Sequence, residues 1–320
     1  MGRTALITGA TGFVGGHLAE RLAAEGWTVR ALARPTSDTA RLRALGAELA
    51  TGSLDDVDAL TAAADGADTV FHLAALTTAP NEDAFRRANA GGTRNVARAA
   101  LRGGTRPRRL VYLSSYAACG PAVSGRPRRM DEPPAPLTAY GRTKLEGEAA
   151  AREVVPAGVE LVTLRAPAVY GPGDRAFLPV FRLAKRFVAP VPTGPLRHVH
   201  LVYVHDLVTA LANAARVEPG TYAVAEPVAH PYPELVAEIG RAVGTRPIRL
   251  PIPAGLLRTA GALAERMGGM GVFSREKADE MLAEAWVCDL AGSQALLPRA
   301  TPLAEGMAET ARWYRTQGWL

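Results

Sequence analysis

Three glycines near the start of the chain constrain its fold more than any other feature of the sequence. Residues 8–16 read Thr-Gly-Ala-Thr-Gly-Phe-Val-Gly-Gly, so Gly9, Gly12 and Gly15 recur at every third position. The β-type run 4–8 precedes them, and an amphipathic helix pattern follows. In a strand–turn–helix unit, Gly9 permits the tight turn, Gly12 lets the backbone approach a diphosphate, and Gly15 lets helix pack on strand. The helix N-terminus adds free N–H groups and a positive dipole, so the unit predicts a dinucleotide site.

Strand and helix patterns alternate along the first half of the chain. Predicted strands cover residues 4–8, 28–33, 47–51, 69–73, 109–114 and 159–165. Predicted helices lie between them, including 38–45, one opened by Asp55, 82–102 and 139–153. This alternation predicts parallel βαβ units, and hence an α/β fold with a doubly wound parallel sheet of the Rossmann type.

The alternation ends after Val169. Predicted helices then lie near 177–187, 206–216, 232–243, 254–267, 274–284 and 303–315, and short strand candidates at 199–204, 221–225 and 247–250. We read the proline-rich segments 189–195 and 247–253 as loops. We therefore expect a dinucleotide-binding domain over 1–169 and a smaller, mostly helical substrate-binding lobe over 170–320. The lobe should cover the carboxyl ends of the sheet, and some of its segments can return to the sheet.

Composition excludes several classes of protein. The net charge is +6, but the basic residues are scattered and almost all are arginine, so no basic face predicts a nucleic-acid partner. The sequence contains no run of about 18 apolar residues that could span a membrane, and the apolar run near its start is too short for a signal peptide. Two cysteines provide neither a disulfide framework nor metal-ligand spacing. We expect a cytoplasmic protein with no metal, nucleic-acid or membrane partner.

The end of the second strand indicates which dinucleotide binds. NAD sites usually place Asp or Glu there to hold the ribose 2′-hydroxyl, and NADP sites substitute Arg. Here no carboxylate precedes Asp38, and Arg34 can contact a 2′-phosphate in bidentate fashion. The alternative is a solvated arginine on an arginine-rich surface. We predict NADP(H) in preference to NAD(H).

A second group of residues carries acid–base chemistry. Tyr140 and Lys144 are four residues apart near a helix start, so both side chains lie on one face. A phenol with its reference pKa of about 10 is a poor catalyst at neutral pH, and a nearby ammonium lowers that pKa. Ser115 follows the fifth strand and can hydrogen-bond the same substrate oxygen. Ser114 is the alternative hydroxyl, and we predict Ser115.

These residues, together with Arg-Ala-Pro-Ala-Val-Tyr-Gly-Pro-Gly-Asp at 165–174, resemble the extended short-chain dehydrogenase/reductase family, in its epimerase/dehydratase group. The resemblance covers essentially the whole chain. It implies that Tyr140 is the general acid/base, that Lys144 binds the nicotinamide ribose, and that Ser115 polarises the substrate carbonyl. The cofactor contacts that it implies are Gly9, Thr11, Gly12, Phe13, Val14, Gly15, Arg34, Ser53, Leu54, Leu73, Ala74, Ala75, Tyr140, Lys144, Pro167 and Val169.

Three departures from the family pattern indicate which branch of the family the chain resembles. Ser53 stands where the family often has an adenine-contacting Asp, and Ser115-Tyr116-Ala117 lacks the carboxyl groups of the 4,6-dehydratases. The segment 195–201 lacks the polar, glycine-rich character of the sugar-nucleotide branches. The chain thus looks most like the dihydroflavonol-reductase and 3β-hydroxysteroid-dehydrogenase branch.

The resemblance implies a reductase or dehydrogenase that acts on a ketone/aldehyde or hydroxyl of a small, fairly apolar substrate. Two alternatives stay open: a nucleotide-sugar epimerase with tightly held NAD, and a non-catalytic nucleotide-binding subunit. Family members commonly pair through the helices that match 82–102 and 139–153. We expect a homodimer here, through apolar faces that include Val96, Ala99, Ala100, Leu145 and Ala149.

Overall fold

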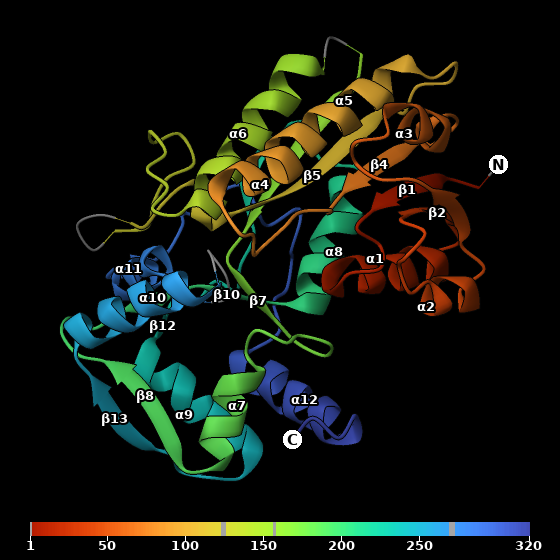
Figure 1. The fold of residues 1–320 in the computed structure, drawn as a ribbon. Coiled ribbons are helices and arrows are strands. Elements are labelled where there is room, and N and C mark those ends of the chain that lie inside the picture. The colour runs from red at the N-terminus through yellow and green to blue at the C-terminus, as the bar shows by residue number, and fades with distance from the viewer. Residues whose placement is uncertain (1, 123–125, 156–157, 269–272) are drawn as a thin grey trace.

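The computed structural model describes residues 2–122, 126–155, 158–268 and 273–320, and its centre is a seven-stranded sheet (Figure 1). The strand order is β3-β2-β1-β4-β5-β6-β11, and every neighbouring pair is parallel. The strands are β1 (Thr4–Thr8), β2 (Thr28–Ala33), β3 (Glu48–Thr51), β4 (Thr69–His72), β5 (Arg109–Ser115), β6 (Glu160–Ala166) and β11 (Gly220–Ala223). The predicted doubly wound parallel sheet is confirmed, and its order reverses direction between β1 and β4.

Helices cover both faces of the sheet (Figure 1). One face carries α3 (Val57–Ala64), α4 (Glu82–Arg86), α5 (Gly92–Arg102) and α6 (Ala139–Val154), and the other carries α1 (Phe13–Ala24), α2 (Ala40–Ala44) and α8 (Val204–Ala214). The central strands read as continuous apolar runs because both of their faces are buried.

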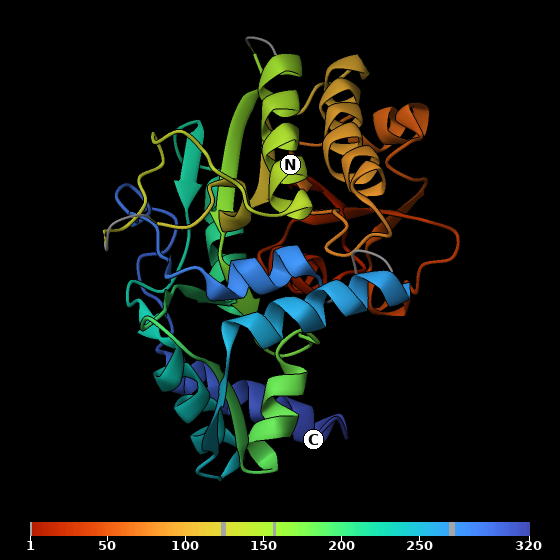
Figure 2. The ribbon, with the colours of Figure 1, turned by 60° about the vertical axis from the view of Figure 1, so that its left-hand side comes forward.

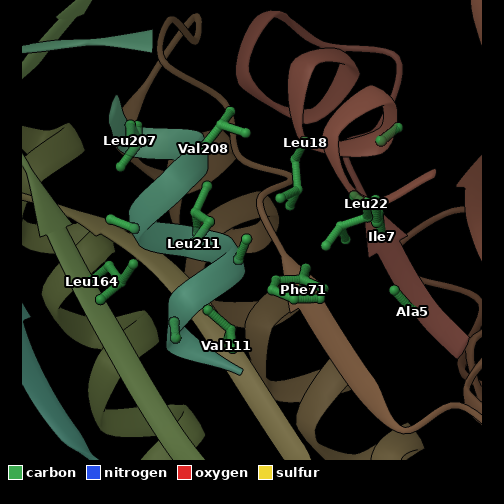
Figure 3. Close-up of a cluster of buried hydrophobic side chains, with 14 of the residues drawn as sticks. Ala5, Ile7, Leu18, Leu22, Phe71, Val111, Leu164, Leu207, Val208 and Leu211 are labelled. Atoms are coloured by element: carbon green, nitrogen blue, oxygen red, sulfur yellow. The ribbon is translucent and has the colours of Figure 1, made fainter. Parts of the chain in front are cut away.

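The core lies between the sheet and the α1/α8 layer. Figure 3 shows side chains from all three sources meeting there: Ile7, Phe71, Val111 and Leu164 from the sheet, Leu18 and Leu22 from α1, and Leu207, Val208 and Leu211 from α8. Each of these residues is at most 2% exposed. Residues 204–223, which supply α8 and β11, therefore complete the central sheet although they lie beyond residue 169.

Two predicted helices differ in detail from the structure. The pattern over 82–102 is α4 and α5 joined by a π-helical turn at Arg87–Gly91, which the helical period does not reveal. The helix expected to open at Asp55 begins at Val57, because the Asp56 carboxylate accepts from the Ala59 N–H at 2.9 Å and caps the helix.

The remaining elements form a lobe beside the carboxyl ends of the strands (Figure 1). Its helices are α7 (Leu178–Lys185), α9 (Tyr232–Val243), α10 (Ala254–Gly268), α11 (Arg275–Leu282) and α12 (Leu303–Thr316). Short strands β7 (Ala168–Tyr170) and β10 (Leu201–Tyr203) pair in parallel, as do β9 (His198–Val199) and β14 (Ala285–Trp286), while β12 (His230–Pro231) pairs antiparallel with β9. The expected mostly helical lobe is confirmed. None of the helices in the described ranges is long and apolar enough to cross a bilayer.

Both proline-rich segments contain strands: the loop expected over 189–195 is wrong, whereas the short strand candidate at 247–250 is confirmed within the segment 247–253. Residues Val188–Pro192 form β8, which pairs in parallel with β13 (Ile248–Ile252). Proline lacks a backbone donor and is tolerated where a strand has a free edge. A two-stranded sheet has such an edge on each strand, so the prolines did not prevent strand formation.

Candidate active site

The predicted site residues converge on the carboxyl edge of the central sheet. Gly9 follows β1, Arg34 follows β2, and Ser53 follows β3. The segment 73–75 follows β4, and Ser115 ends β5. Parallel strands bring these endings together at one edge, beside the switch point between β1 and β4, where open α/β sheets bind ligands.

The glycine loop is shaped by two close backbone contacts. Gly9 has φ +79°, and a Cβ on it would lie 2.7 Å from the Ala74 nitrogen. A Cβ on Gly15 would overlap the carbonyl oxygen of Gly9. Only glycine fits at either position, so the loop can bring β1, the segment after β4 and the start of α1 into direct contact.

The N-terminus of α1 suits the diphosphate of a dinucleotide. Helix α1 begins at Phe13 after Gly12, and within the described part of the chain no side chain caps it and no acidic residue occupies its first turn. Thr11 and Gly12 are exposed at the carboxyl edge, next to Phe13 and Val14. Uncapped N–H groups and the positive end of the helix dipole favour an anionic ligand.

Tyr140 and Ser115 are brought together by α6 and β5. Helix α6 begins after Thr138, whose hydroxyl accepts from the Gly141 N–H at 3.1 Å. Burial raises the pKa of the half-buried Tyr140 to about 12, and the nearby Ser115 hydroxyl opposes the rise. Ser115 also accepts from the Ala117 N–H at 3.1 Å, which fixes its hydroxyl at the end of the strand.

Ser114 points into a different environment. Its hydroxyl donates to the buried Glu148 carboxylate at 2.6 Å, and Glu148 also accepts two hydrogen bonds from Arg165, at 2.9 and 2.8 Å. Burial opposes ionisation of Glu148, but hydrogen bonds from Arg165 outweigh it, and the net effect lowers the pKa of Glu148. The hydroxyl of Ser114 is therefore committed to this ion pair, and Ser115 is the serine that meets Tyr140.

Lys144 is fully enclosed beside the tyrosine. Only 2% of the residue is exposed, and its Nζ donates to the Leu113 carbonyl oxygen at 2.7 Å. The same ammonium lies 4.2 Å from the centroid of the Tyr112 ring, a cation–π contact. Burial lowers the pKa of Lys144 to about 7, and the charge of Glu148 acts against that shift.

The expected lowering of the Tyr140 pKa by Lys144 is not what the polypeptide produces. Desolvation dominates at both residues, so the pKa of the phenol rises and that of the ammonium falls. Lys144, with its pKa of about 7, has lost its charge at the pH where the phenol titrates, so it cannot offset the burial of Tyr140 there. At neutral pH the chain by itself therefore holds Tyr140 as a neutral phenol.

Two further residues of this site escaped the sequence analysis. A Cβ on Gly141 would overlap the Ala117 carbonyl oxygen, so this glycine lets α6 approach the turn that follows Ser115. Glu148 lies one helical turn after Lys144, and that i, i+4 spacing was a readable signal. Arg165 is a charged residue in a predicted strand, which indicates that it needs a buried partner of opposite charge, here Glu148.

The part of the site that we expect to face adenine lies at β2, β3 and α5. Leu54 packs against Gly92, and its carbonyl oxygen accepts from the Asn95 side chain at 2.8 Å. Ser53 accepts from the Asp55 N–H at 3.2 Å. Arg34 is exposed at the end of β2, and among the described residues it makes no ion pair.

The segment after β4 is held by the π-helical turn. Asn89 lies in that turn, and its side chain accepts from Leu76 N at 2.8 Å and donates to Leu76 O at 3.1 Å. The same amide donates to Thr143 on α6 at 3.2 Å. Leu73, Ala74 and Ala75 are thereby fixed between the glycine loop and α6. On the far side, Pro167 joins β6 to β7, where Val169 pairs with Val202 of β10.

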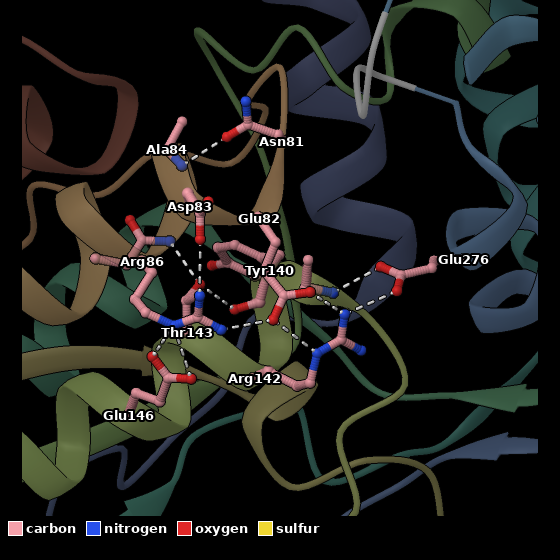
Figure 4. A network of polar contacts seen from close by, with 12 residues as sticks. Asn81, Glu82, Asp83, Ala84, Arg86, Tyr140, Arg142, Thr143, Glu146 and Glu276 are labelled. Carbon is pink, nitrogen blue, oxygen red and sulfur yellow. Dashed lines mark hydrogen bonds and ion pairs between the residues drawn. The ribbon is translucent and has the colours of Figure 1, made fainter. Parts of the chain in front are cut away.

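A polar network ties the lobe to the start of α6 (Figure 4). Glu276 of α11 accepts from the Ala139 N–H at 2.6 Å and from Arg142 at 2.9 Å. Arg142 also donates to Glu82 of α4 at 2.6 Å. Figure 2 shows α11 next to the beginning of α6, so the lobe contacts the helix one residue before Tyr140.

Comparisons with known proteins agree with this geometry. Residues 5–225 match the model of the NAD dependent epimerase/dehydratase family. The chain is 34% identical over 324 residues to the ceramide reductase of Caulobacter vibrioides, which covers 98% of this chain and 95% of that protein. It is 31% identical over 232 residues to the 3 beta-hydroxysteroid dehydrogenase/Delta 5-->4-isomerase of Mycobacterium tuberculosis, covering 68% and 61% of the two chains.

Solved structures share the fold over nearly the whole length. The crystal structure of gox2253 superposes with a TM-score of 0.83 at 24% identity and covers 99% of both chains. MoeE5, solved in complex with UDP-glucose and NAD, gives a TM-score of 0.73 at 25% identity and covers 98% of this chain and 99% of its own.

Proposed function

The chain belongs to the NAD-dependent epimerase/dehydratase family, as its motifs predicted, and we propose that it is an NADP(H)-dependent oxidoreductase that interconverts a ketone or aldehyde and an alcohol. Members of this family are NAD(P)-dependent enzymes of the extended short-chain dehydrogenase type, and this chain is one of them. The single observation that carries the proposal is the meeting of Ser115 and Tyr140 at the carboxyl edge, with Lys144 one turn along α6.

The protonation of Tyr140 supports the reductive direction. A phenol with a pKa of about 12 keeps its proton at neutral pH, so it can donate that proton to a carbonyl oxygen. Ser115 donates a second hydrogen bond to the same oxygen and stabilises the charge that develops on it. The phenolate left behind regains its proton from solvent. Oxidation would require the phenolate beforehand, which burial disfavours.

The cofactor would be held by the glycine loop, by Lys144 and by Arg34. Bound NADPH supplies the hydride that the carbonyl carbon accepts. The exposed guanidinium of Arg34 at the end of β2 supports a contact with the 2′-phosphate. Lys144 would donate to the nicotinamide ribose, since its ammonium has donors to spare beyond its bond to Leu113.

An apolar substrate is supported by the surface around Tyr140. Leu76 is 41% exposed after β4, and Leu137 is 38% exposed just before α6. Phe85 packs within 6.3 Å of the Tyr140 ring, measured between centroids. Two relatives are named for lipid-like substrates, a ceramide and a steroid. We infer that the substrate presents its carbonyl beside a hydrocarbon body.

A nucleotide-sugar epimerase with tightly bound NAD is the alternative, and the likeness to MoeE5 favours it. The segment 195–201 argues against it. Arg197, its arginine, is buried and donates to the carbonyl oxygens of Pro192, Thr193, Pro195 and Leu282. A guanidinium that already donates its hydrogen bonds to backbone carbonyls is not free to bind the diphosphate of a nucleotide. A non-catalytic subunit has less support, because Ser115, Tyr140 and Lys144 are all retained.

We propose a homodimer that forms across the outer sides of α5 and α6, but with other interface residues than those predicted from the sequence. Val96, Ala99 and Ala100 are at most 2% exposed, and Val96 and Ala99 pack in the chain's own core, so these three residues cannot form the interface that we predicted from the sequence. The outer side instead carries a groove of about 590 Å³ lined by Ala90, Gly91, Ala149 and Ala150 among charged residues. We also propose a cytoplasmic location, which the free, buried Cys119 and Cys288 fit.

Two measurements test the proposal together. The nucleotide content of the purified protein separates an exchanging reductase from an epimerase that retains NAD. NADPH oxidation is then followed against long-chain ketones and keto-steroids, with UDP-glucose epimerisation assayed in parallel. We expect little retained nucleotide and turnover with apolar ketones. Stoichiometric bound NAD together with sugar epimerisation would establish the alternative instead.

A further inference from the structure

The two-stranded sheet β8–β13 exposes large apolar side chains at the end of the lobe. Ile248 is 75% exposed, Phe187 is 57% exposed and Leu250 is 51% exposed. Ile248 and Leu250 are two residues apart on β13, so their side chains point to the same face. In Figure 1 this sheet lies at the lower left, remote from the central sheet. We call Phe187, Ile248 and Leu250 the apolar tip.

Phe187 is held at the apolar tip in an unfavourable backbone conformation. Its φ is +63°, and no other non-glycine residue among those described has a positive φ. Its N–H donates to Ala184 O at 2.9 Å, and its carbonyl oxygen accepts from Ile248 N at 2.8 Å. A bulky side chain in the left-handed region is an outlier that persists only where the surroundings impose it. The ring gains little packing in return, because more than half of it faces outward.

The two chain segments that form the apolar tip carry charges of one sign only. Segment 182–197 contains four basic residues and segment 244–264 contains three, and neither contains an aspartate or glutamate. The cations nearest the tip in sequence are Lys185, Arg186, Arg246 and Arg249, all exposed. Within the described residues none of these four makes an ion pair. The chain as a whole has 37 basic and 31 acidic residues, so this separation of charge is local.

We propose that the apolar tip and the cations Lys185, Arg186 and Arg246 beside it dock the protein on the surface of an anionic lipid bilayer; Arg249 is left out because strand alternation places it on the face of β13 opposite to Ile248 and Leu250. Aliphatic and aromatic side chains enter the boundary between head groups and acyl chains, while lysine and arginine bind the lipid phosphates. A chain does not need a spanning helix for this contact, so the proposal revises our expectation of no membrane partner. It is independent of the catalytic proposal, because it invokes no residue of the active site.

Two other occupants fit the apolar tip less well. A second copy of the same face would bring six exposed cations together, three from each copy, and this repulsion disfavours self-association. Nucleic acid would satisfy the cations but not the aliphatic side chains of Ile248 and Leu250, which offer nothing to a phosphate backbone. A bilayer surface satisfies both the charge and the hydrocarbon.

The test is co-sedimentation of the full-length protein with vesicles. One preparation is phosphatidylcholine alone, and the other contains phosphatidylcholine and phosphatidylglycerol. The apolar variant is Phe187→Asn with Ile248→Ser, since asparagine tolerates the left-handed conformation and the fold is retained. The charge variant is Lys185→Ala with Arg186→Ala. The control is Arg102→Ala with Arg106→Ala, two exposed arginines on the nucleotide-binding part of the chain.

We expect binding to the anionic vesicles that weakens with salt and is lost on neutral vesicles. Each basic residue near an anionic surface contributes roughly fivefold to partitioning, so the charge variant should lose at least about tenfold. The apolar variant should lose a similar factor, and the control should bind like wild type. The proposal is overturned if wild type ignores both vesicles, or if both tip variants bind unchanged. It is equally overturned if duplex DNA binds the protein and vesicles do not.

Discussion

Lys144 donates a hydrogen bond over 2.7 Å to the carbonyl oxygen of Leu113, two residues before Ser115. This bond joins α6 directly to β5, the strand that carries the serine. Tyr140 lies one helical turn before Lys144 on the same face of α6. The lysine therefore fixes the position of α6 along β5, and with it the position of Tyr140 relative to Ser115, in addition to any role toward a cofactor.

The buried charge of Lys144 should make stability depend on pH. Its pKa is 10.5 in the unfolded chain and about 7 in the folded one, so the unfolded state binds more protons between these values. Stability must then rise as the pH increases from about 7 to 10.5, and the cost of burying the charge is fully present below pH 7. Lys144→Met removes that cost. We expect its gain in the free energy of unfolding to be on the order of a few kcal/mol at pH 6 and to vanish toward pH 10.5.

Thermal melts of wild type and Lys144→Met at pH 6 and pH 9 check this expectation. Part of the gain is offset because the Leu113 carbonyl loses its donor, but that loss does not vary with pH. A difference in stability that is the same at both pH values would show that the pKa of Lys144 is not lowered by folding and that its ammonium stays charged in the folded protein.

Tyr140→Phe should separate chemistry from binding. The substitution keeps the ring beside Phe85 and removes only the hydroxyl. Turnover of a true ketone substrate should fall by about 10²–10⁴-fold, while NADPH affinity stays near that of wild type. Tyr222→Phe is the matched control, because that hydroxyl donates to Glu218 O on the surface at 2.8 Å. Near-full turnover in Tyr140→Phe would mean that another group delivers the proton.

Cofactor preference should depend on Arg34. One charge-assisted contact with a phosphate contributes about 1.5–3 kcal/mol, so Arg34→Ala should weaken NADPH binding by roughly ten- to a hundredfold and leave NADH unchanged. Arg41→Ala is the control, because Arg41 is already bonded to Glu20, with both contacts at 2.6 Å. Fluorescence titration measures both cofactors. An equal loss for NADPH and NADH would identify Arg34 as a bystander.

Gly141 should be intolerant of any side chain. Its Cβ would overlap the Ala117 carbonyl, so Gly141→Ala must push α6 away from the turn after Ser115. We expect a loss of about 1–3 kcal/mol in stability, as for other overpacked sites, together with lost turnover. Gly255→Ala in α10 is the control, since a Cβ there meets nothing within 4 Å and alanine favours helix by about 1 kcal/mol. Chemical denaturation measures the free energy of unfolding of both variants. Similar values for the two would contradict the predicted clash between a Cβ at Gly141 and the Ala117 carbonyl.

The groove between α5 and α6 should be the site of self-association. Sedimentation at micromolar concentration should give a dimer for wild type. Ala149 is exposed on α6 and lines the groove, so Ala149→Arg should shift the protein to monomer without altering its far-UV circular dichroism. A wild-type protein that sediments only as a monomer would remove the homodimer from the proposal.

Much of the site could be read from the sequence because its parts are local. The glycine loop needs only a strand, three glycines and a helix start, all within residues 4–24. Tyr140 and Lys144 share a face because the helical period places them there. The alternation of strands and helices also predicted the parallel sheet. In each case the determining interactions join residues close together in the chain, where periodicity and turn chemistry are visible.

The tertiary structure decided the features that depend on distant segments. It brought β11 to the edge of β6 and paired β8 with β13. It also buried Tyr140 and Lys144, so that the pKa of Tyr140 rises, whereas their spacing had led us to expect a lowered pKa. Finally, it placed Val96 in the core of the chain, where the helix pattern alone had led us to assign it to a dimer interface. A sequence shows which side chains can be apolar, charged or acidic, but desolvation and pairing depend on what the rest of the chain packs around them, and that is a property of the folded molecule.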